Sequence, residues 1–314
     1  MTEQSSNISN TGPIGLPIAA VERETGLGKD TLRVWERRYG FPTPTRDEHG
    51  NRLYSSEQVQ RLRNIKRLLD QGLRPGTVFA MNDTELNAHI GASISANIAS
   101  QKIPKSLELH WSHLLEHRGT ELRQVLTRDL ARLGVASFLE RVVIPLNDLT
   151  GSSWAAGDIQ VFEEHLYTEI ITRVLRQGIS VVQDQQTPGR PVVLLTTMPG
   201  ESHGLGLLMA EATLALHGAQ CVSLGTQTPL QDIAEAAKAH EADIVALSFS
   251  AYPAARQVTQ SIEALLEALP TKVSVWVGGS NAKLNSLRSD RLRTFSDLTT
   301  IQEALEAWRL NHLN

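Results

Sequence analysis

The chain has 314 residues, of which 41% are hydrophobic and 20% are charged, and its formal net charge is −4. This length allows two or three domains of ordinary size, and the composition is typical of a globular protein. One cysteine, Cys221, excludes an internal disulfide framework and fits a reducing compartment. The chain begins without a signal-peptide pattern, and no apolar run approaches the ~20 residues of a membrane span. We therefore expect a cytoplasmic protein without a membrane partner.

Positive charge is concentrated near the beginning of the chain. Residues 14–81 contain twelve Lys and Arg residues and eight Asp and Glu residues, a net charge of +4, so the rest of the chain carries −8. A basic segment on an acidic body is the asymmetry expected when one end of a protein binds phosphates. A chance fluctuation in composition is the alternative that charge alone leaves open.

The first hundred residues are expected to form an arm, a compact domain and a linker. Residues 1–13 are rich in Ser, Asn and Thr and predict a flexible arm, and the polar residues 83–101 predict a linker. The domain between them, 14–82, has helical and extended patterns. Its expected elements are a helix near 17–24, a helix near 29–39, two short extended pieces around the turn His49-Gly50-Asn51, and a helix from Ser55.

The patterning then changes from helical to alternating. Leucines at helical spacing over 102–182 predict a domain like a four-helix bundle, with its last helix at about 158–177. Over 190–314 apolar strands alternate with helices, which predicts a flavodoxin-like doubly wound parallel sheet. The expected strands are 191–198, 220–224, 244–249 and 273–277, and the expected helices are 203–217, 230–240, 256–269 and 300–310. The predicted fold is a multi-domain combination of α+β and α/β parts.

The second expected helix, residues 29–39, has the features of a DNA recognition helix. It follows a short helix and a glycine-bearing turn, as in a helix-turn-helix, whose second helix enters the major groove. Arg33 and Arg37 share its outer face, while Leu32 and Trp35 can pack inward. A single arginine is more often a solvated surface residue, so the prediction depends on the combination. The expected DNA-binding residues are Lys29, Thr31, Arg33, Trp35, Arg37, Arg46, Arg52 and Tyr54.

A wing along the DNA backbone is expected from the extended pair that carries Arg46 and Arg52. The run Thr31–Pro42 and the wing sequence Pro44–Tyr54 resemble the winged helix-turn-helix of the MerR family, over about residues 14–82. The resemblance implies a dimer on double-stranded, near-palindromic operator DNA. Metal sensing by clustered cysteines is excluded because the chain has one cysteine.

The loop after the first expected strand of the C-terminal domain contains Glu201 and His203. Ligands of parallel sheets bind at the carboxyl ends of strands, and a histidine with a nearby carboxylate can ligate a metal. Gly206 allows a bulky ligand to approach the backbone. Taken alone, the motif is more often a surface turn, and such a fold can equally hold a nucleotide. The other candidate residues at this edge are Gly225, Ser248, Ser250, Gly278 and Gly279.

Together these residues resemble the cobalamin-binding domain of methionine synthase and related mutases. Glu201 takes the place of the more usual aspartate, and Ser250 stands where leucine is common. The resemblance implies that His203 is the lower axial ligand of cobalt and that Glu201 hydrogen-bonds it. The residues implied to line the channel of the nucleotide tail are Ser248, Ser250, Gly278 and Gly279.

The helical domain has a second resemblance. Trp154, followed after nine residues by Glu164 and His165, is similar to the Trp-x9-Glu-His pattern of the CarH/LitR-type light-sensing repressors. In that group these residues surround the adenosyl group of adenosylcobalamin. An interfacial aromatic residue and an ordinary helix histidine are the alternatives. Where the group has a histidine that becomes the upper cobalt ligand after photolysis, this chain has Ala155, which has no lone pair for cobalt.

The order of these parts implies a cobalamin-dependent transcriptional repressor and not an enzyme. Adenosylcobalamin, with methylcobalamin or hydroxocobalamin as alternatives, is expected to set dimer or tetramer formation and thereby DNA binding. The group also implies a photoreceptor, although Ala155 removes its bis-histidine end state from this site. The competing hypotheses are a cobalamin carrier of a methyltransferase or mutase system and a MerR regulator that responds to a protein partner without a cofactor.

Two further features have alternative explanations. His110, His113 and His117 have a spacing compatible with zinc. The apolar residues between them occupy the alternate helix face, which favours histidines that face solvent and bind no metal. Cys221 lies in an apolar run, so we expect a buried strand residue and not a reactive thiol.

Overall fold

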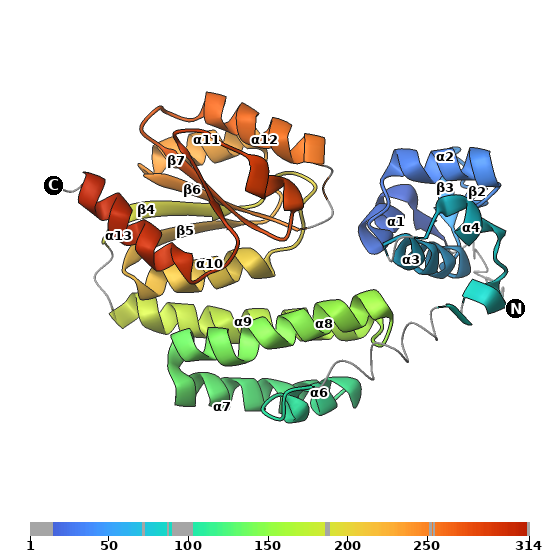
Figure 1. Cartoon of the computed structure of the whole chain (residues 1–314), viewed down its shortest axis with the longest axis horizontal. Coiled ribbons are helices and arrows are strands. Elements are labelled where there is room, and N and C mark those ends of the chain that lie inside the picture. Colours follow the sequence, from blue (N-terminus) through green and yellow to red (C-terminus); the bar gives the residue numbers. More distant parts are fainter. Residues whose placement is uncertain are drawn as a thin grey trace, which may run out of the picture. The chain divides into compact units, whose positions relative to one another are not determined.

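The computed structural model describes residues 15–70, 73–86, 88–89, 103–185, 189–250, 253 and 255–312 (Figure 1). The chain divides into two compact units. One consists of Met1–Lys102 with Ser152–Asp158, and the other of Ile103–Gly151 with Ile159–Asn314. The expected arm, 1–13, and most of the expected linker, 83–101, lie outside the described residues.

The N-terminal unit combines short helices with a small antiparallel sheet. Its elements are β1 (Leu16–Pro17), α1 (Ile18–Thr25), α2 (Lys29–Tyr39), β2 (Thr45–Arg46), β3 (Arg52–Tyr54), α3 (Ser56–Asp70) and α4 (Pro75–Ala80). In the sheet, β3 lies between β1 and β2, and Arg46 pairs with Arg52 in the hairpin. The expected helix-turn-helix and hairpin are confirmed. The strand β1 was not predicted, because two residues show no period.

Glycines in the left-handed conformation close the two helices of the helix-turn-helix. Gly26 has φ 67° and donates its N–H to the carbonyl of Glu22, which ends α1. Gly40 has φ 68° and ends α2. The apolar faces of the helices then meet in one core, which includes Val21, Leu32, Trp35, Tyr54, Val59, Leu62 and Ile65.

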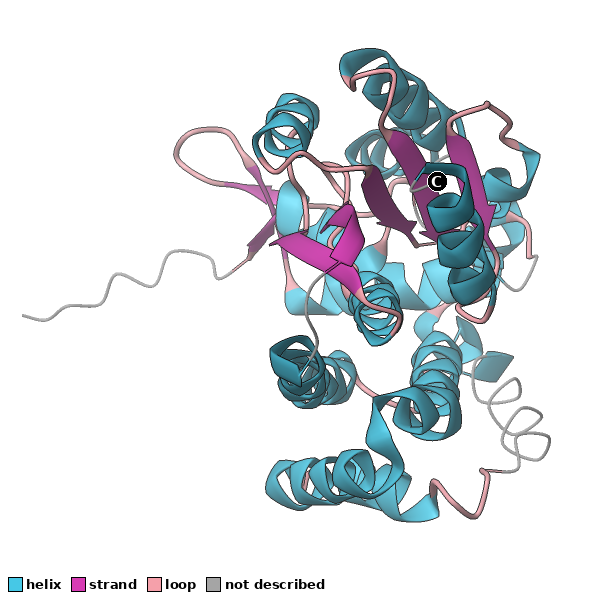
Figure 2. Ribbon diagram, turned by 90° about the vertical axis from the view of Figure 1, so that its left-hand side faces the viewer, coloured by secondary structure: helices cyan, strands magenta, loops and turns pink. Residues whose placement is uncertain are grey.

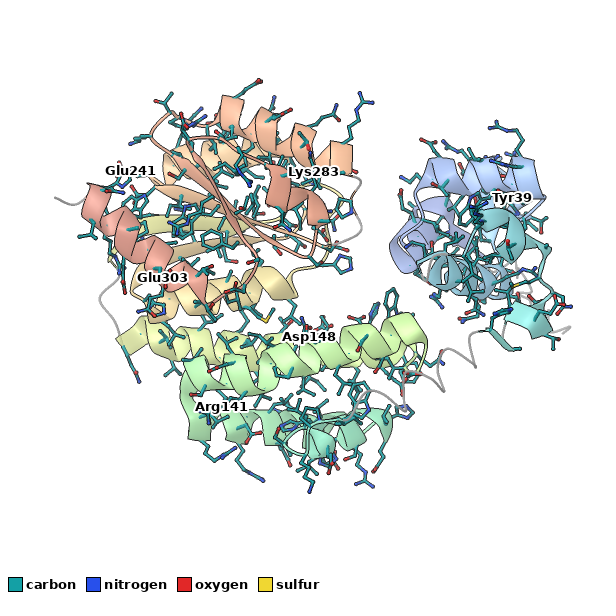
Figure 3. All side chains as sticks on the ribbon, in the orientation of Figure 1. Tyr39, Arg141, Asp148, Glu241, Lys283 and Glu303 are labelled. Carbon is teal, nitrogen blue, oxygen red and sulfur yellow. The ribbon has the colours of Figure 1, made fainter. Side chains whose placement is uncertain are left out.

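A helical region precedes the parallel sheet. Its elements are α6 (Glu108–Leu115), α7 (Gly119–Phe138), a π-helix (Leu139–Val143), α8 (Ile144–Ala156) and α9 (Val161–Gln185). In Figure 2, as in Figure 1, α6, α7 and α9 lie below the parallel sheet. The π-helix has a cause in the sequence: Pro145 has no N–H, and its ring would clash with the carbonyl of Arg141 in a regular α-helix (Arg141 is labelled in Figure 3).

The C-terminal part of the second unit is a doubly wound parallel sheet. Its elements are β4 (Gly189–Thr196), α10 (Leu205–Leu216), β5 (Ala219–Gly225), α11 (Leu230–Ala239), β6 (Ile244–Phe249), α12 (Ala255–Ala268), β7 (Ser274–Gly279), a 3-10 helix (Ala282–Ser286), β8 (Leu292–Phe295) and α13 (Thr300–His312). The strand order is β5-β4-β6-β7-β8, and all pairs are parallel. This is the flavodoxin-like order, so the loops after β4 and β6 border the crevice where such sheets bind ligands.

The predicted doubly wound sheet is thus confirmed, with one strand more than expected. The strand β8 was missed because its four residues, Leu-Arg-Thr-Phe, alternate with polar side chains at the sheet edge. Helices α11 and α12 cover one face of the sheet, and α10 and α13 cover the other (Figure 1). Helix α9 lies along α10, where Arg176 Nη1 is 2.8 Å from Oε2 of the buried Glu211.

Candidate cofactor site and nucleic-acid interface

The loop between β4 and α10 holds His203 on a buried carboxylate. Glu201 is 2% exposed, and its Oε1 lies 2.6 Å from Nδ1 and 3.0 Å from the backbone N of His203. Burial raises the pKa of Glu201, but hydrogen bonds from His203 and Ser250 outweigh burial and leave the pKa below the ordinary 4.5. An ionised carboxylate only accepts hydrogen bonds, so Nδ1 of His203 carries the proton and Nε2 has the lone pair of the neutral ring.

The same contact changes the basicity of the imidazole. The hydrogen bond to Glu201 raises the pKa of His203 above the ordinary 6.5, against the effect of burial, and the charges of Glu201 and Glu164 raise it further. Glu164 belongs to α9, so the beginning of α9 lies within electrostatic range of this loop. The side chain of His203 is 58% exposed. A histidine with one ring nitrogen bound to a carboxylate is the usual form of a metal ligand.

Ser250, which follows β6, and Asn281, which follows β7, complete this hydrogen-bond network. Ser250 donates its backbone N–H at 2.8 Å and its Oγ at 2.7 Å to Oε2 of Glu201. Asn281, which is buried, donates from Nδ2 to the carbonyls of Ser250 and Pro253 at 3.1 and 3.0 Å. The structure therefore brings the candidate residues Glu201, His203 and Ser250 together. Sequence reasoning missed Asn281, although a polar residue two positions after a glycine-rich strand end is a recognisable signal.

Different structural features explain why glycine occupies each of the candidate positions. A Cβ on Gly279, whose φ is 122°, would lie 2.0 Å from the carbonyl oxygen of Phe249, so only glycine fits there. A Cβ on Gly206 would lie 3.0 Å from Oγ of Ser248. A Cβ on Gly278 would meet Phe295 at an ordinary 3.7 Å. Close packing of the chain on itself accounts for Gly279 and Gly206, and Gly225 has φ 80° with nothing within 4 Å of a Cβ.

Glu164 and His165 lie in the first turns of α9 and contact each other. Nδ1 of His165 is 2.6 Å from Oε2 of Glu164, and Oγ1 of Thr168 donates to Oε1 at 2.8 Å. Thr168 was not among the predicted residues, but it lies one helical turn after Glu164. Trp154 is partly buried in α8, within the segment Ser152–Asp158 of the other compact unit. The side chain of Ala155 lies outside the described residues.

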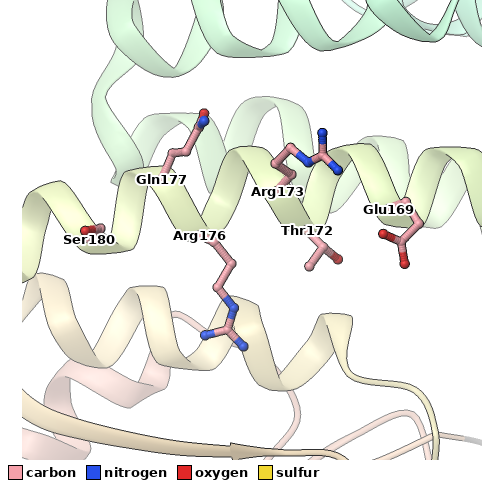
Figure 4. A pocket seen from close by; sticks show the side chains of 6 residues that line it. All are labelled: Glu169, Thr172, Arg173, Arg176, Gln177 and Ser180. Atoms are coloured by element: carbon pink, nitrogen blue, oxygen red, sulfur yellow. The ribbon is translucent and has the colours of Figure 1, made fainter.

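A groove of about 490 Å³ runs along α9 (Figure 4). Its lining residues are Glu169, Thr172, Arg173, Arg176, Gln177 and Ser180. All of them come from one helix, and none belongs to the network of Glu201 and His203. The groove is therefore a feature of the surface of α9, separate from the candidate site.

The predicted DNA-binding arginines are exposed or held by acidic partners. Arg33 Nη1 lies 3.0 Å from Oδ1 of Asp30 on the same helix, and Arg37 is exposed. Arg52 makes two contacts with Glu36, at 2.8 Å from Nε and 3.4 Å from Nη2. The second pair joins β3 to α2 and sets the position of the wing relative to the recognition helix.

The remaining predicted DNA-binding residues divide into two groups. Lys29, Thr31 and Arg46 are exposed on the surface of this unit. Trp35 is 7% exposed and Tyr54 is 0% exposed, so a direct DNA contact from these two side chains was a wrong prediction. Trp35 instead packs edge-on against Phe79 in the core. Both aromatic rings pack against apolar neighbours in the core, where they stabilise the recognition helix and the wing.

His110 and His113 lie in α6, and His117 lies just after this helix. His110 is buried, with Nε2 2.8 Å from Oδ2 of Asp129, so the prediction that all three histidines face solvent was wrong for His110. His117 Nε2 lies 3.0 Å from Glu163. Within the described ranges, no group of three or more His, Cys, Asp or Glu side chains is arranged to hold a metal ion. Cys221 is partly buried in β5, and burial raises the pKa of its thiol to about 12, which fits the expected unreactive strand residue.

Comparisons with known proteins match three segments of the chain. Residues 16–80 match the MerR HTH family regulatory protein model, and residues 191–291 and 110–177 match two B12 binding domain models. In the described part of the chain, no helix has the length and apolar character that crossing a membrane requires.

Similar proteins extend over most of the sequence. The chain is 31% identical over 270 residues to the HTH-type transcriptional repressor CarA of Myxococcus xanthus, covering 85% of this chain and 88% of CarA. It is 29% identical over 271 residues to the repressor CarH of the same organism, covering 85% and 89%. A solved structure of the Methanosarcina barkeri monomethylamine corrinoid protein has a TM-score of 0.51, with 17% identity, and covers 64% of this chain and 96% of that one. That similarity supports the fold alone.

CarA and CarH, which match most of this chain, are transcriptional repressors by name, and the MerR HTH model matches the unit that contains the recognition helix. The supported cofactor class is cobalamin, and the supported partner is DNA. The chain therefore belongs to the family of cobalamin-binding, MerR-type transcriptional regulators that includes CarA and CarH.

Proposed function

We propose that this regulator is a repressor whose assembly, and hence whose affinity for operator DNA, is set by bound cobalamin. The observation that carries the proposal is the buried Glu201 that holds His203 at the ligand-binding crevice, in a chain that also has a helix-turn-helix. A ligand that binds one assembly better than another shifts the population toward that assembly. Several DNA-binding domains in one dimer or tetramer have a higher effective concentration on the operator.

The residues present fit cobalamin by their donor chemistry. His203 would ligate cobalt through Nε2 on the lower face, and Glu201 and Ser250 would fix the orientation of the ring. The residues proposed to line the channel of the nucleotide tail are Ser248, Ser250, Gly278 and Gly279, and Gly206 and Gly225 are proposed as further cofactor-binding residues. Bound cobalamin would supply a cobalt centre that an imidazole can ligate and, in its alkyl forms, a cobalt–carbon bond that light can break.

Adenosylcobalamin is the form that the residues of the helical region favour. Glu164 and His165 present a carboxylate and an imidazole that can hydrogen-bond the hydroxyls and amine of an adenosyl group. Trp154 is proposed as its aromatic neighbour. Since light breaks the bond to that group, green light is the proposed signal.

The proposed DNA contacts come from the exposed basic residues of the N-terminal unit. Arg33 and Arg37 on α2 would reach base edges or phosphates in the major groove, and Arg46 would follow the backbone from the wing. Arg52 would act mainly through its pair with Glu36.

The test is gel filtration and DNA binding of the full chain with adenosylcobalamin, in the dark and after green light. We expect the corrinoid to elute with the protein at a larger size than the 34.5 kDa chain, and light to change that size and the DNA affinity. A wild-type chain that elutes without corrinoid would refute the cofactor proposal. Retention without a light effect would refute the photoreceptor part alone.

A further inference from the structure

One apolar side chain, Val34, lies on the exposed face of the recognition helix α2. Leu32 and Trp35 are buried in the core of this unit, whereas Val34 is 40% exposed. Among the described residues, it belongs neither to that core nor to the partly buried apolar residues that pack against it. Valine has a lower helix propensity than alanine, lysine or glutamate. Neither core packing nor helix stability therefore accounts for a valine at this position.

The neighbours of Val34 on the helix surface are charged. Residues four positions apart are adjacent on a helix, so Val34 lies between Asp30 and Arg38. Arg33 Nη1 is 3.0 Å from Oδ1 of Asp30. Arg38 lies over the ring of Tyr39, with its guanidinium carbon 5.3 Å from the ring centroid. Both neighbours are thus engaged by other partners, and the methyl groups of Val34 stay accessible.

The surface around Val34 matches the chemistry of the major groove of DNA. Arg33 and Arg37 are exposed on the same helix and carry positive charge that suits phosphates and guanine edges. A valine side chain forms no hydrogen bond, so it can distinguish bases only by apolar contact. Thymine is the base whose major-groove edge has an apolar group, the C5 methyl, and small apolar side chains contact this group. The partner that Val34 fits is therefore a thymine in the groove.

We propose that Val34 is a specificity-determining residue of this regulator, which contacts the C5 methyl group of a thymine in the operator. The proposal rests on the proposed DNA contacts of α2 and adds the base that the apolar part of this helix selects. Cytosine has no methyl group at C5, so a C·G pair at the same position would leave the methyl groups of Val34 without an apolar partner. The arginines contribute affinity through charge, and Val34 contributes selectivity at one base pair.

The experiment replaces single thymines by uracil, which removes the C5 methyl group and leaves base pairing unchanged. The full chain, with adenosylcobalamin in the dark, first selects duplexes from random sequence, and each thymine of a selected duplex is then replaced in turn. Fluorescence anisotropy measures the dissociation constant of each duplex. We expect the selected duplexes to share a thymine, at which uracil weakens binding by the wild type about fourfold, the effect of one buried methyl group.

The variant Val34→Ser tests whether this side chain makes the contact. Serine and valine have similar helix propensities, and the position is exposed, so the variant should fold. It should bind the thymine duplex and the uracil duplex with equal affinity. Val181→Ser is the matched control, because Val181 is 54% exposed on α9, and this variant should keep the difference of about fourfold between the two duplexes.

The outcomes separate this proposal from the proposed function. Selected duplexes that share no thymine, or wild-type binding that no uracil weakens, would overturn the methyl contact and leave DNA binding in place. A difference between thymine and uracil that persists in Val34→Ser would assign the contact to another side chain and overturn the role of Val34. A wild-type chain that selects no duplex would overturn the proposed DNA binding as well.

Discussion

Glu201 and His203 are two residues apart in the chain, and the 2.6 Å contact between Oε1 and Nδ1 decides which ring nitrogen is offered to a ligand. The carboxylate is 2% exposed, whereas the imidazole is more than half exposed. The fold thus buries the charge that orients the ring and leaves the ring itself accessible.

Glu201→Gln should weaken corrinoid binding. The amide cannot supply the negative charge that orients and polarises the imidazole, and outer-shell losses of this kind cost about 10–100-fold in metal affinity. Isothermal titration with aquacobalamin measures the change. Glu235→Gln, at an exposed ion pair with Lys238, is the matched control and should leave the affinity unchanged.

Cobalt coordination by His203 should depend on pH in the physiological range. Cobalt and a proton compete for Nε2, and Glu201 raises the pKa of His203 above the ordinary 6.5. Coordination is therefore favoured above the raised pKa and weakens as the pH falls below it, where the proton competes with cobalt for the ring. The pKa of Glu201 lies below 4.5, so this carboxylate stays charged throughout. An absorption titration from about pH 8 to 5 follows the change.

The same titration can be repeated with Glu201→Gln and its midpoint compared with that of the wild type. In Glu201→Gln the midpoint should move to lower pH, because the hydrogen bond that raises the pKa of His203 loses its charge. A midpoint that does not move would separate the pH dependence from this pair.

Glu36→Gln should lower DNA affinity, although it removes a negative charge beside the DNA-binding surface. Glu36 holds Arg52 by two contacts and thereby fixes the wing on α2. Losing a hydrogen bond to a charged group costs ~1.5 kcal/mol, about tenfold in affinity. The measurement is fluorescence anisotropy with a DNA duplex selected by the wild-type chain. Tighter binding by Glu36→Gln would show that the negative charge of Glu36 affects DNA affinity more than its positioning of the wing does.

Arg33→Ala and Arg37→Ala should each weaken DNA binding by ~1–3 kcal/mol if they contact bases, and relax specificity at one position. If one of these arginines contacts only phosphate, its alanine variant should instead bind all sequences more weakly and with a smaller salt dependence. Arg132→Ala, on the exposed surface of α7, is the control. Corrinoid retention by both helix variants should equal that of the wild type.

Adjacent glycines provide a matched pair for stability. In Gly279→Ala the new Cβ would lie 2.0 Å from the backbone oxygen of Phe249, and φ is 122°, so we expect a loss of at least ~3 kcal/mol or a failure to fold. In Gly278→Ala the nearest atom is at 3.7 Å, and we expect a change below ~1 kcal/mol. Thermal unfolding measures both. Equal effects would contradict the packing explanation for Gly279.

Sequence patterns predicted much of the fold because most elements are long enough to show a period. The recognition helix, the hairpin and the four strands of the sheet core follow from apolar spacing and glycine positions. The two-residue β1 and the polar edge strand β8 lack that signal. Trp35 and Tyr54 were included among the DNA-binding residues as members of the recognition helix and the wing, yet tertiary packing places both side chains in the core.

For the candidate site, the sequence predicted only the groupings of residues that are close together in the chain. The spacing of Glu201 and His203 was visible in the sequence, and so was the pair Glu164-His165. The hydrogen bonds from Ser250 and Asn281 depend on strand order, which brings the ends of β6 and β7 beside the β4–α10 loop. The partnership of Glu36 and Arg52 likewise joins residues sixteen apart across the helix and the wing.

The most direct test of the cofactor-controlled repressor is gel filtration of the full chain with and without adenosylcobalamin in the dark, followed at the absorption of both protein and corrinoid. We predict that the corrinoid elutes with the protein, that the assembly is larger than the cofactor-free form, and that His203→Ala abolishes both effects. A wild-type chain that elutes at the same volume in both conditions, without corrinoid, would contradict the account.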